Sequence, residues 1–371
     1  MTEPPVNDPA PAQQPAAVPP PQQWAWVQPQ QPLVPTQTEP LEYHRLYRGV
    51  AKYGWWKPLV VLVLAASIYF AMNIGLSLLL APLIFIFDPE YANGAILLQE
   101  DALLDTQHPW SLVLNMGLII LMIPAVLLAM LALGIRPVGR IWSVAGRMRW
   151  GLLGRTLGAA LAGVIVMNAV GIAIDMVVTG ISGETPPPAT ETATDFNVNA
   201  AIISMVLVLV LVPFQAAAEE VVFRGLALQV LGSWMRLPWL AVGLSSVIFA
   251  AMHIYDIWGL IAVGLMGLVA AWITWKTGGL EAAIAIHVLN NYVAFAFMAS
   301  GITGETAQVE SSGGIEGVIG EIAGLAVFAW LTMRIFRKHG YGRERIDTIM
   351  RPAPLAPPAS PATPAQPGVQ Q

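Results

Sequence analysis

Three ionisable side chains interrupt a long apolar stretch in the second half of this sequence. Glu219, Glu220 and Arg224 lie in the run that begins at Gln215 and is otherwise built of Ala, Val and Phe. In a helix, Glu220 and Arg224 share a face and can form an ion pair, while Glu219 points about 100° away. This spacing leaves Glu219 to face a cavity and act on water as a general base. A salt-bridge cluster that only positions the helix is the alternative interpretation.

Two histidines follow in later apolar stretches, each with a distinctive neighbour at helical spacing. Phe249 lies one turn before His253, and Asn291 lies one turn after His287. A single histidine in a membrane helix usually makes a packing contact. Two on separate helices, downstream of an acidic pair, favour a functional site, because buried ionisable groups in a bilayer are costly.

Two chemistries fit these residues, and both hydrolyse an amide bond. In one, histidine and carboxylate ligands hold a zinc ion that activates its bound water. In the other, Glu219 and His253 polarise a water, and His287 with Asn291 stabilises the oxyanion. The sequence has no His-Glu-x-x-His pattern, and an amide after the last histidine suits an oxyanion donor. We therefore favour the second chemistry, and Zn²⁺ stays open as a cofactor.

The composition indicates that these residues are positioned by membrane-spanning helices. Of the 371 residues, 56% are apolar and 11% are charged, against about 25% charged in an average soluble domain. The absence of cysteine excludes disulfides, thiolate zinc sites and a cysteine nucleophile, and the net charge of -5 gives no basic field for nucleic acid. We predict an all-α fold, a polytopic membrane bundle of about eight transmembrane helices. The predicted spans are residues 58–87, 109–133, 157–178, 200–231, 238–252, 258–275, 280–298 and 315–335, with Pro82 and Pro213 as candidate kink points.

The placement of Lys and Arg predicts the orientation of these spans. Alternate connections are rich in Lys and Arg, whereas the connections 88–108, 181–199, 253–257 and 301–314 contain neither. By the positive-inside rule both termini are cytoplasmic, and we expect a multi-pass protein of a bacterial plasma membrane. The Pro-rich residues 1–40 and 346–371 are predicted to be disordered cytoplasmic tails around a transmembrane domain at 41–345.

The three elements in this order carry a family resemblance. Glu-Glu-x-x-x-Arg (219–224), Phe-x-x-x-His (249–253) and His-x-x-x-Asn (287–291) resemble the motifs of the CPBP family of intramembrane proteases, also called the CAAX protease or Abi family, which includes the type II CAAX prenyl endopeptidases. The similar core covers residues 199–300. The resemblance implies a glutamate-dependent endopeptidase, with Glu219 as the base, Glu220 and Arg224 supporting it, His253 as the second activating residue, and His287 and Asn291 at the oxyanion site. Asp175 and Glu321 fall outside the pattern and are expected at a hydrophilic cavity or near an interface.

The predicted function is the hydrolysis of a peptide bond in a membrane-associated protein or peptide, including lipidated ones. The partners are therefore the lipid bilayer and such a substrate, and no nucleic acid. A catalytically silent membrane scaffold, bacteriocin-immunity or regulatory protein with the same fold is the alternative, and a transporter with buried acids as a proton relay is the third hypothesis.

Overall fold

A computed structural model describes residues 31–96, 104–182, 196–302, 304–309 and 314–353. The chain divides into a small unit, residues 1–35 with 350–371, and a large unit, Thr36–Ile349. Of the predicted tails, residues 1–30 and 354–371 lie outside the described residues. The described parts of the tails contain strands β1 (Leu33–Gln37) and β4 (Thr348–Pro352), which pair with each other. The short strands β2 (Leu41–Glu42) and β3 (Glu344–Arg345), which are their neighbours in the sequence, form a second, antiparallel pair.

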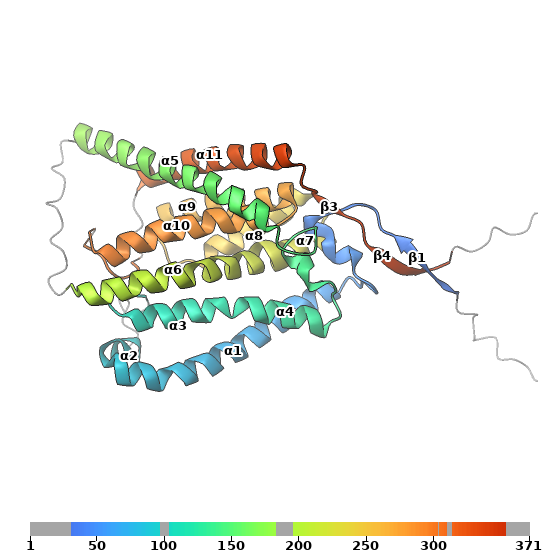
Figure 1. Ribbon diagram of the computed structural model, residues 1–371, viewed down its shortest axis with the longest axis horizontal. Helices are drawn as coiled ribbons and strands as arrows, with labels where there is room; N and C mark the ends of the chain where they lie inside the picture. Colours follow the sequence, from blue (N-terminus) through green and yellow to red (C-terminus); the bar gives the residue numbers. More distant parts are fainter. Residues whose placement is uncertain (1–30, 97–103, 183–195, 303, 310–313, 354–371) are drawn as a thin grey trace, which may run out of the picture. The chain divides into compact units, whose positions relative to one another are not determined.

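Long apolar helices make up the large unit, which confirms the predicted polytopic helical bundle (Figure 1). In the described part of the chain, seven helical segments are long and apolar enough to cross a membrane. The helices are α1 (Lys57–Phe87), α2 (Pro89–Ile96), α3 (Pro109–Ile120), α4 (Met122–Ala132), α5 (Trp150–Ser182), α6 (Val198–Glu220), α7 (Leu228–Trp234), α8 (Pro238–Ala251), α9 (Ile257–Thr277), α10 (Glu281–Ser300) and α11 (Ile315–His339).

One predicted span is shorter than a full crossing. Helix α8 has 14 residues, so its length is about 21 Å, against a hydrocarbon core of about 30 Å. It packs against α9, and the turn 252–256 joins the two helices. The turn that carries His253 therefore joins a short helix to one of full spanning length.

Proline breaks one span at a position that was not among the predicted kink points. Helices α3 and α4 meet at Leu121, three residues before Pro124. Pro124 has no amide hydrogen and its ring crowds the carbonyl group four residues earlier, which accounts for the break. Pro82 and Pro213, the predicted kink points, lie inside helices that continue past them.

Glycines allow α5 and α11 to pack closely along their length (Figure 1). A Cβ atom at Gly324 would lie 2.5 Å from the carbonyl oxygen of Gly163, and one at Gly320 would lie 2.4 Å from the carbonyl oxygen of Met167. Small residues four apart let membrane helices approach until their backbones touch. The pair α5 and α11 thus forms one wall of the bundle, against which α9 and α10 also pack.

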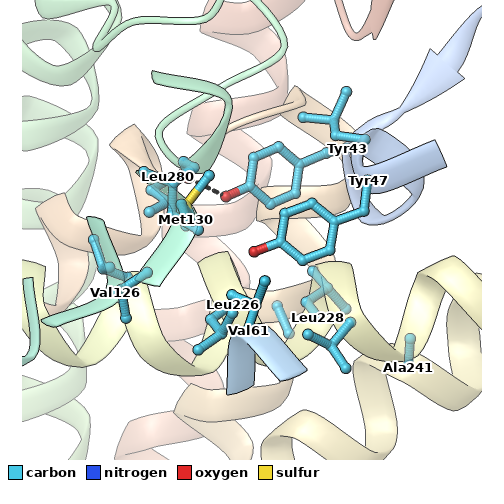
Figure 2. Packing of buried hydrophobic residues seen from close by; sticks show 14 of the residues in the cluster. Tyr43, Tyr47, Val61, Val126, Met130, Leu226, Leu228, Ala241 and Leu280 are labelled. Atoms are coloured by element: carbon cyan, nitrogen blue, oxygen red, sulfur yellow. Dashed lines mark hydrogen bonds between the residues drawn. The ribbon is translucent and has the colours of Figure 1, made fainter. Parts of the chain in front are cut away.

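A buried N-terminal segment closes one end of the bundle. The 3-10 helix Tyr43–Gly49 inserts Tyr43 and Tyr47 among apolar residues that include Leu226 and Leu228 (Figure 2). The Tyr43 hydroxyl donates a hydrogen bond to the carbonyl oxygen of Ile141, drawn as a dashed line in Figure 2. The segment before the first span is therefore part of the folded core.

Basic residues from distant parts of the sequence meet at this end. Arg48 Nε donates to the carbonyl oxygen of Ser233 at 2.7 Å, and Arg140 Nη1 donates to that of Leu46 at 2.6 Å. Arg149 holds Glu281 through two hydrogen bonds of 2.8 and 2.7 Å. The Arg-rich connections thus share one end of the bundle, as the alternation of charge predicts, while the side of the membrane on which this end lies stays a prediction.

Candidate active site

The acidic pair lies where α6 gives way to a wider helical turn. Glu219 and Glu220 are the last residues of α6, and residues Val221–Ala227 form a π-helix that leads into α7. Such π-helical turns are rare and occur often at functional sites. The predicted ion pair is present: Arg224 Nη1 donates to Glu220 Oε1 at 2.9 Å, and both side chains are buried. Glu220 and Arg224 therefore neutralise each other inside the bundle.

His287 of α10 lies between the two carboxylates. Its Nδ1 is 2.8 Å from Glu220 Oε1, and its Nε2 is 3.5 Å from Glu219 Oε2. Helices α6 and α10 pack against each other, which brings His287 to the end of α6. This geometry places His287 within the carboxylate cluster, whereas the resemblance implies an oxyanion role for it beside Asn291.

A chain of amides links Asn291 to Glu219. Asn291 Nδ2 donates to Gln215 Oε1 at 3.0 Å, and Gln215 Nε2 donates to Glu219 Oε1 at 2.6 Å. Gln215 was not among the predicted site residues, although its position four residues before Glu219 on one helix is a readable signal. One oxygen of Glu219 is thus fixed by Gln215, and Oε2, which is buried, makes no hydrogen bond with the described residues.

Phe249 is the packing centre of the site. It is fully buried, with its ring 5.1 Å from that of Phe223 and 4.8 Å from that of His253, and the Arg224 guanidinium lies over it at 4.0 Å. Gly267 of α9 leaves room for this stack, because a Cβ atom there would lie 3.1 Å from both Arg224 and Phe249. The Phe249 backbone also holds His253, whose Nδ1 is 2.9 Å from its carbonyl oxygen. If Nδ1 carries the proton, Nε2 of His253 is an acceptor.

These side chains line a cavity of about 420 Å³. Glu219, His253, His287 and Asn291 all contribute to its wall, whereas Glu220 and Arg224 lie behind it. The structure therefore brings all six predicted site residues into one contact network, with four on the cavity surface. Much of the remaining wall is apolar and includes Met116, Met122, Met252, Met266 and Met298.

Two loop segments meet over one part of this cavity. Gln308, which lines it, donates through its backbone to the carbonyl oxygen of Leu104 at 2.8 Å and through Nε2 to the Tyr255 hydroxyl at 3.1 Å. The Tyr255 ring stacks on His253 with centroids 5.7 Å apart. Leu104, Tyr255 and Gln308 lie far apart in the sequence, so residue spacing within one helix does not predict their contacts.

The donor set does not fit a zinc site in its present arrangement. Among the described residues, no group of three or more His, Cys, Asp or Glu side chains is placed to hold a metal ion. Each ring nitrogen of His287 lies beside a carboxylate oxygen.

Comparisons with known proteins support the resemblance. A chain of 31% identity over 104 residues is the "Uncharacterized protein YyaK" of Bacillus subtilis (strain 168), and the match covers 26% of this chain and 35% of that protein. The match thus spans about a third of the length of this curated relative. No solved structure matches the chain. Residues 200–293, which contain all three motifs, match the family described as "Type II CAAX prenyl endopeptidase Rce1-like", and this confirms the predicted resemblance to the CPBP family over that segment.

Proposed function

We propose that this protein is an intramembrane endopeptidase that uses Glu219 to activate water. The observation that carries the proposal is the placement of Glu219 on the wall of a cavity of about 420 Å³, together with His253, His287 and Asn291. Its Oε1 is held by Gln215, which leaves Oε2 to receive a proton. The family match of residues 200–293 adds support from the sequence.

His287 has both ring nitrogens beside carboxylate oxygens of the cluster. Its Nδ1 lies 2.8 Å from Glu220 Oε1, and its Nε2 lies 3.5 Å from Glu219 Oε2, at the cavity wall. In this proposal the Nε2 edge of the ring donates to an oxyanion in the cavity, which is the role that the family resemblance implies.

The reaction then runs in two proton transfers. A water oriented by Glu219 and His253 Nε2 attacks the carbonyl carbon of the scissile peptide bond, and its proton passes to Glu219 Oε2. His287 Nε2–H and the second N–H of the Asn291 amide stabilise the tetrahedral oxyanion. The C–N bond breaks as Glu219 returns the proton to the leaving amine, which gives a carboxylic acid and an amine.

The test of this function is the search for cleaved membrane proteins. Membranes that contain the wild-type chain are compared with membranes that contain Glu219→Ala, and new protein termini are identified by mass spectrometry. We expect termini that appear only with the wild type, in proteins that co-purify with the Glu219→Ala chain. If the two membranes give the same termini and the substituted chain retains other proteins all the same, a non-catalytic binding role replaces the protease.

A further inference from the structure

A second cavity lies between α5, α9 and α11 and shares no lining residue with the first. Its volume is about 270 Å³. Asn168 of α5, Trp258 of α9, and Gly317 and Glu321 of α11 lie on its wall. Glu321 thus borders a cavity, whereas a hydrophilic cavity or an interface was expected for it from the sequence.

Glu321 is a buried acid on the wall of this cavity. It is 7% exposed, and its buried Oε1 forms no hydrogen bond with any residue that the structure describes. Among the described residues, no Lys, Arg or His lines this cavity. An ionised carboxylate away from water needs a counter-charge, and the described part of the cavity wall supplies none.

The other walls suit an organic cation. An indole is the aromatic group with the strongest attraction for cations over its face, and Trp258 supplies one. Met167, Ile172, Ala262 and Val318 give an apolar surround for the carbon atoms of such a ligand. An ammonium group beside a carboxylate and an indole, with alkyl carbons on apolar walls, satisfies each of these surfaces.

The depth of the cavity suits the headgroup region of a bilayer. Trp258 is the second residue of α9 and Gly317 is the third residue of α11, so the cavity lies at the beginnings of both helices. Helix ends of spanning segments and their tryptophans lie at the level of the lipid headgroups. A lipid headgroup can reach this hollow without crossing the apolar core.

We propose that this cavity binds an ammonium group, with Glu321 as its counter-ion and Trp258 as its aromatic wall. The ligand is the headgroup of an aminophospholipid or a free alkylamine, which share this chemistry. The site is independent of the proposed peptidase chemistry, so a result against one proposal does not count against the other.

The test is a lipid titration followed by native mass spectrometry. The full-length protein, purified in detergent and stripped of lipid, is titrated with dioleoyl phosphatidylethanolamine, with dioleoyl phosphatidylglycerol and with hexylamine. We expect the ethanolamine lipid to bind at least about tenfold more tightly than the glycerol lipid, which has the same acyl chains and no ammonium group. If hexylamine competes with the ethanolamine lipid, or if hexylamine binds and neither lipid does, a free amine is sufficient as the ligand. If hexylamine does not compete, the lipid headgroup is the source of the ammonium group.

Three variants locate the site. Glu321→Gln keeps the shape and removes the charge, so it should abolish the preference for the ammonium ligand. Gly317→Leu fills the space, because no atom lies within 4 Å of a Cβ built there, and it should weaken binding with the carboxylate intact. Asp175→Asn removes an exposed acid of α5 and should leave the preference unchanged. Equal affinity for both lipids without hexylamine binding, or a preference that survives in both Glu321→Gln and Gly317→Leu, overturns the proposal.

Discussion

Nδ1 of His287 lies 2.8 Å from Oε1 of Glu220, the same oxygen that accepts a hydrogen bond from Arg224. The His287 contact joins α10 to α6, and Arg224 holds the same carboxylate oxygen from one turn further along the α6 helical run. The arrangement separates the two adjacent acids: Glu220 is held by structure, and Glu219 faces the cavity. Each of the predictions for the site depends on this division.

Removal of both charges of the Glu220–Arg224 ion pair should cost less free energy of unfolding than removal of the arginine alone. Arg224→Met leaves the buried Glu220 without its guanidinium and should lower the free energy of unfolding by about 3–5 kcal/mol. The double variant with Glu220→Leu removes both charges and should be destabilised less than Arg224→Met alone. Denaturant unfolding in detergent measures this cycle.

The matched control is Arg334→Met, which removes an exposed arginine from another spanning helix. It should change the free energy of unfolding by no more than about 0.5 kcal/mol. Additive losses in the double variant would show that the two charges do not compensate each other.

Gln215 should act as a positioning residue for Glu219. In Gln215→Ala the 2.6 Å bond to Glu219 and the 3.0 Å bond from Asn291 are both lost, so the carboxylate is free to turn. Misplacement of a reacting group by about 1 Å can cost about 100-fold in rate, so we expect kcat to fall by roughly that factor with KM little changed.

Asn73→Ala is the control for this change, since it removes an amide that bonds only within α1. Cleavage by that variant should match the wild type. A Gln215→Ala protein with normal kcat would show that Glu219 is held by other contacts.

The juxtamembrane histidine gives a pH dependence of stability. Burial lowers the pKa of His44 from 6.5 to about 4, against the opposing pull of Glu42, whose Oε2 is 3.8 Å from Nδ1. The unfolded chain therefore binds a proton at His44 as the pH falls below about 6.5, while the folded chain does so only near 4. Protonation of His44 therefore leaves the free energy of unfolding unchanged above pH 6.5. Between pH 6.5 and 4 it lowers the free energy of unfolding by on the order of 3 kcal/mol.

A comparison of His44→Leu with the wild type isolates this term. Unfolding free energies at pH 7 and at pH 4 should differ by less in the variant, because it has no imidazole to protonate. Parallel pH profiles for the two proteins would contradict the assignment.

Metal removal should leave the activity unchanged. Because His287 faces two carboxylates and no three ligands converge among the described residues, the proposed water activation needs only Glu219 and His253. Elemental analysis of active protein and assays after exhaustive chelation test this. Zinc at one equivalent, with activity lost on chelation and restored by Zn²⁺, would require a rearranged site.

Local patterns in the sequence were enough to predict most of the fold. Seven predicted spans coincide with long apolar helices, because a spanning helix is defined by a continuous run of apolar residues. The predicted span 238–252 matches α8 in its bounds, although α8 is shorter than the other spans, and the break at Leu121 was not predicted, since it depends on a proline in the first turn of α4.

Contacts of the site that lie within one helix were predictable from the spacing of the residues. The four-residue separation of Glu220 and Arg224 predicted their ion pair, and the same rule applies to Gln215 and Glu219. The contacts of His287 with both acids depend on how α10 is placed against α6. The contact of Tyr255 with Gln308 depends on the position of a loop that lies 53 residues further along the chain. Spacing within one helix carries no information on such contacts.

Cleavage rates of purified, reconstituted protein decide whether Glu219 and His253 activate the water. The variants Glu219→Gln and His253→Ala are assayed on a substrate trapped by the Glu219→Ala chain. Glu219→Gln keeps the hydrogen-bond network in shape but cannot accept a proton, and His253→Ala removes the second group that orients water. With folding verified for each variant, we expect cleavage to fall to background in Glu219→Gln and by at least about 100-fold in His253→Ala. Wild-type rates in both variants would show that neither side chain activates the water.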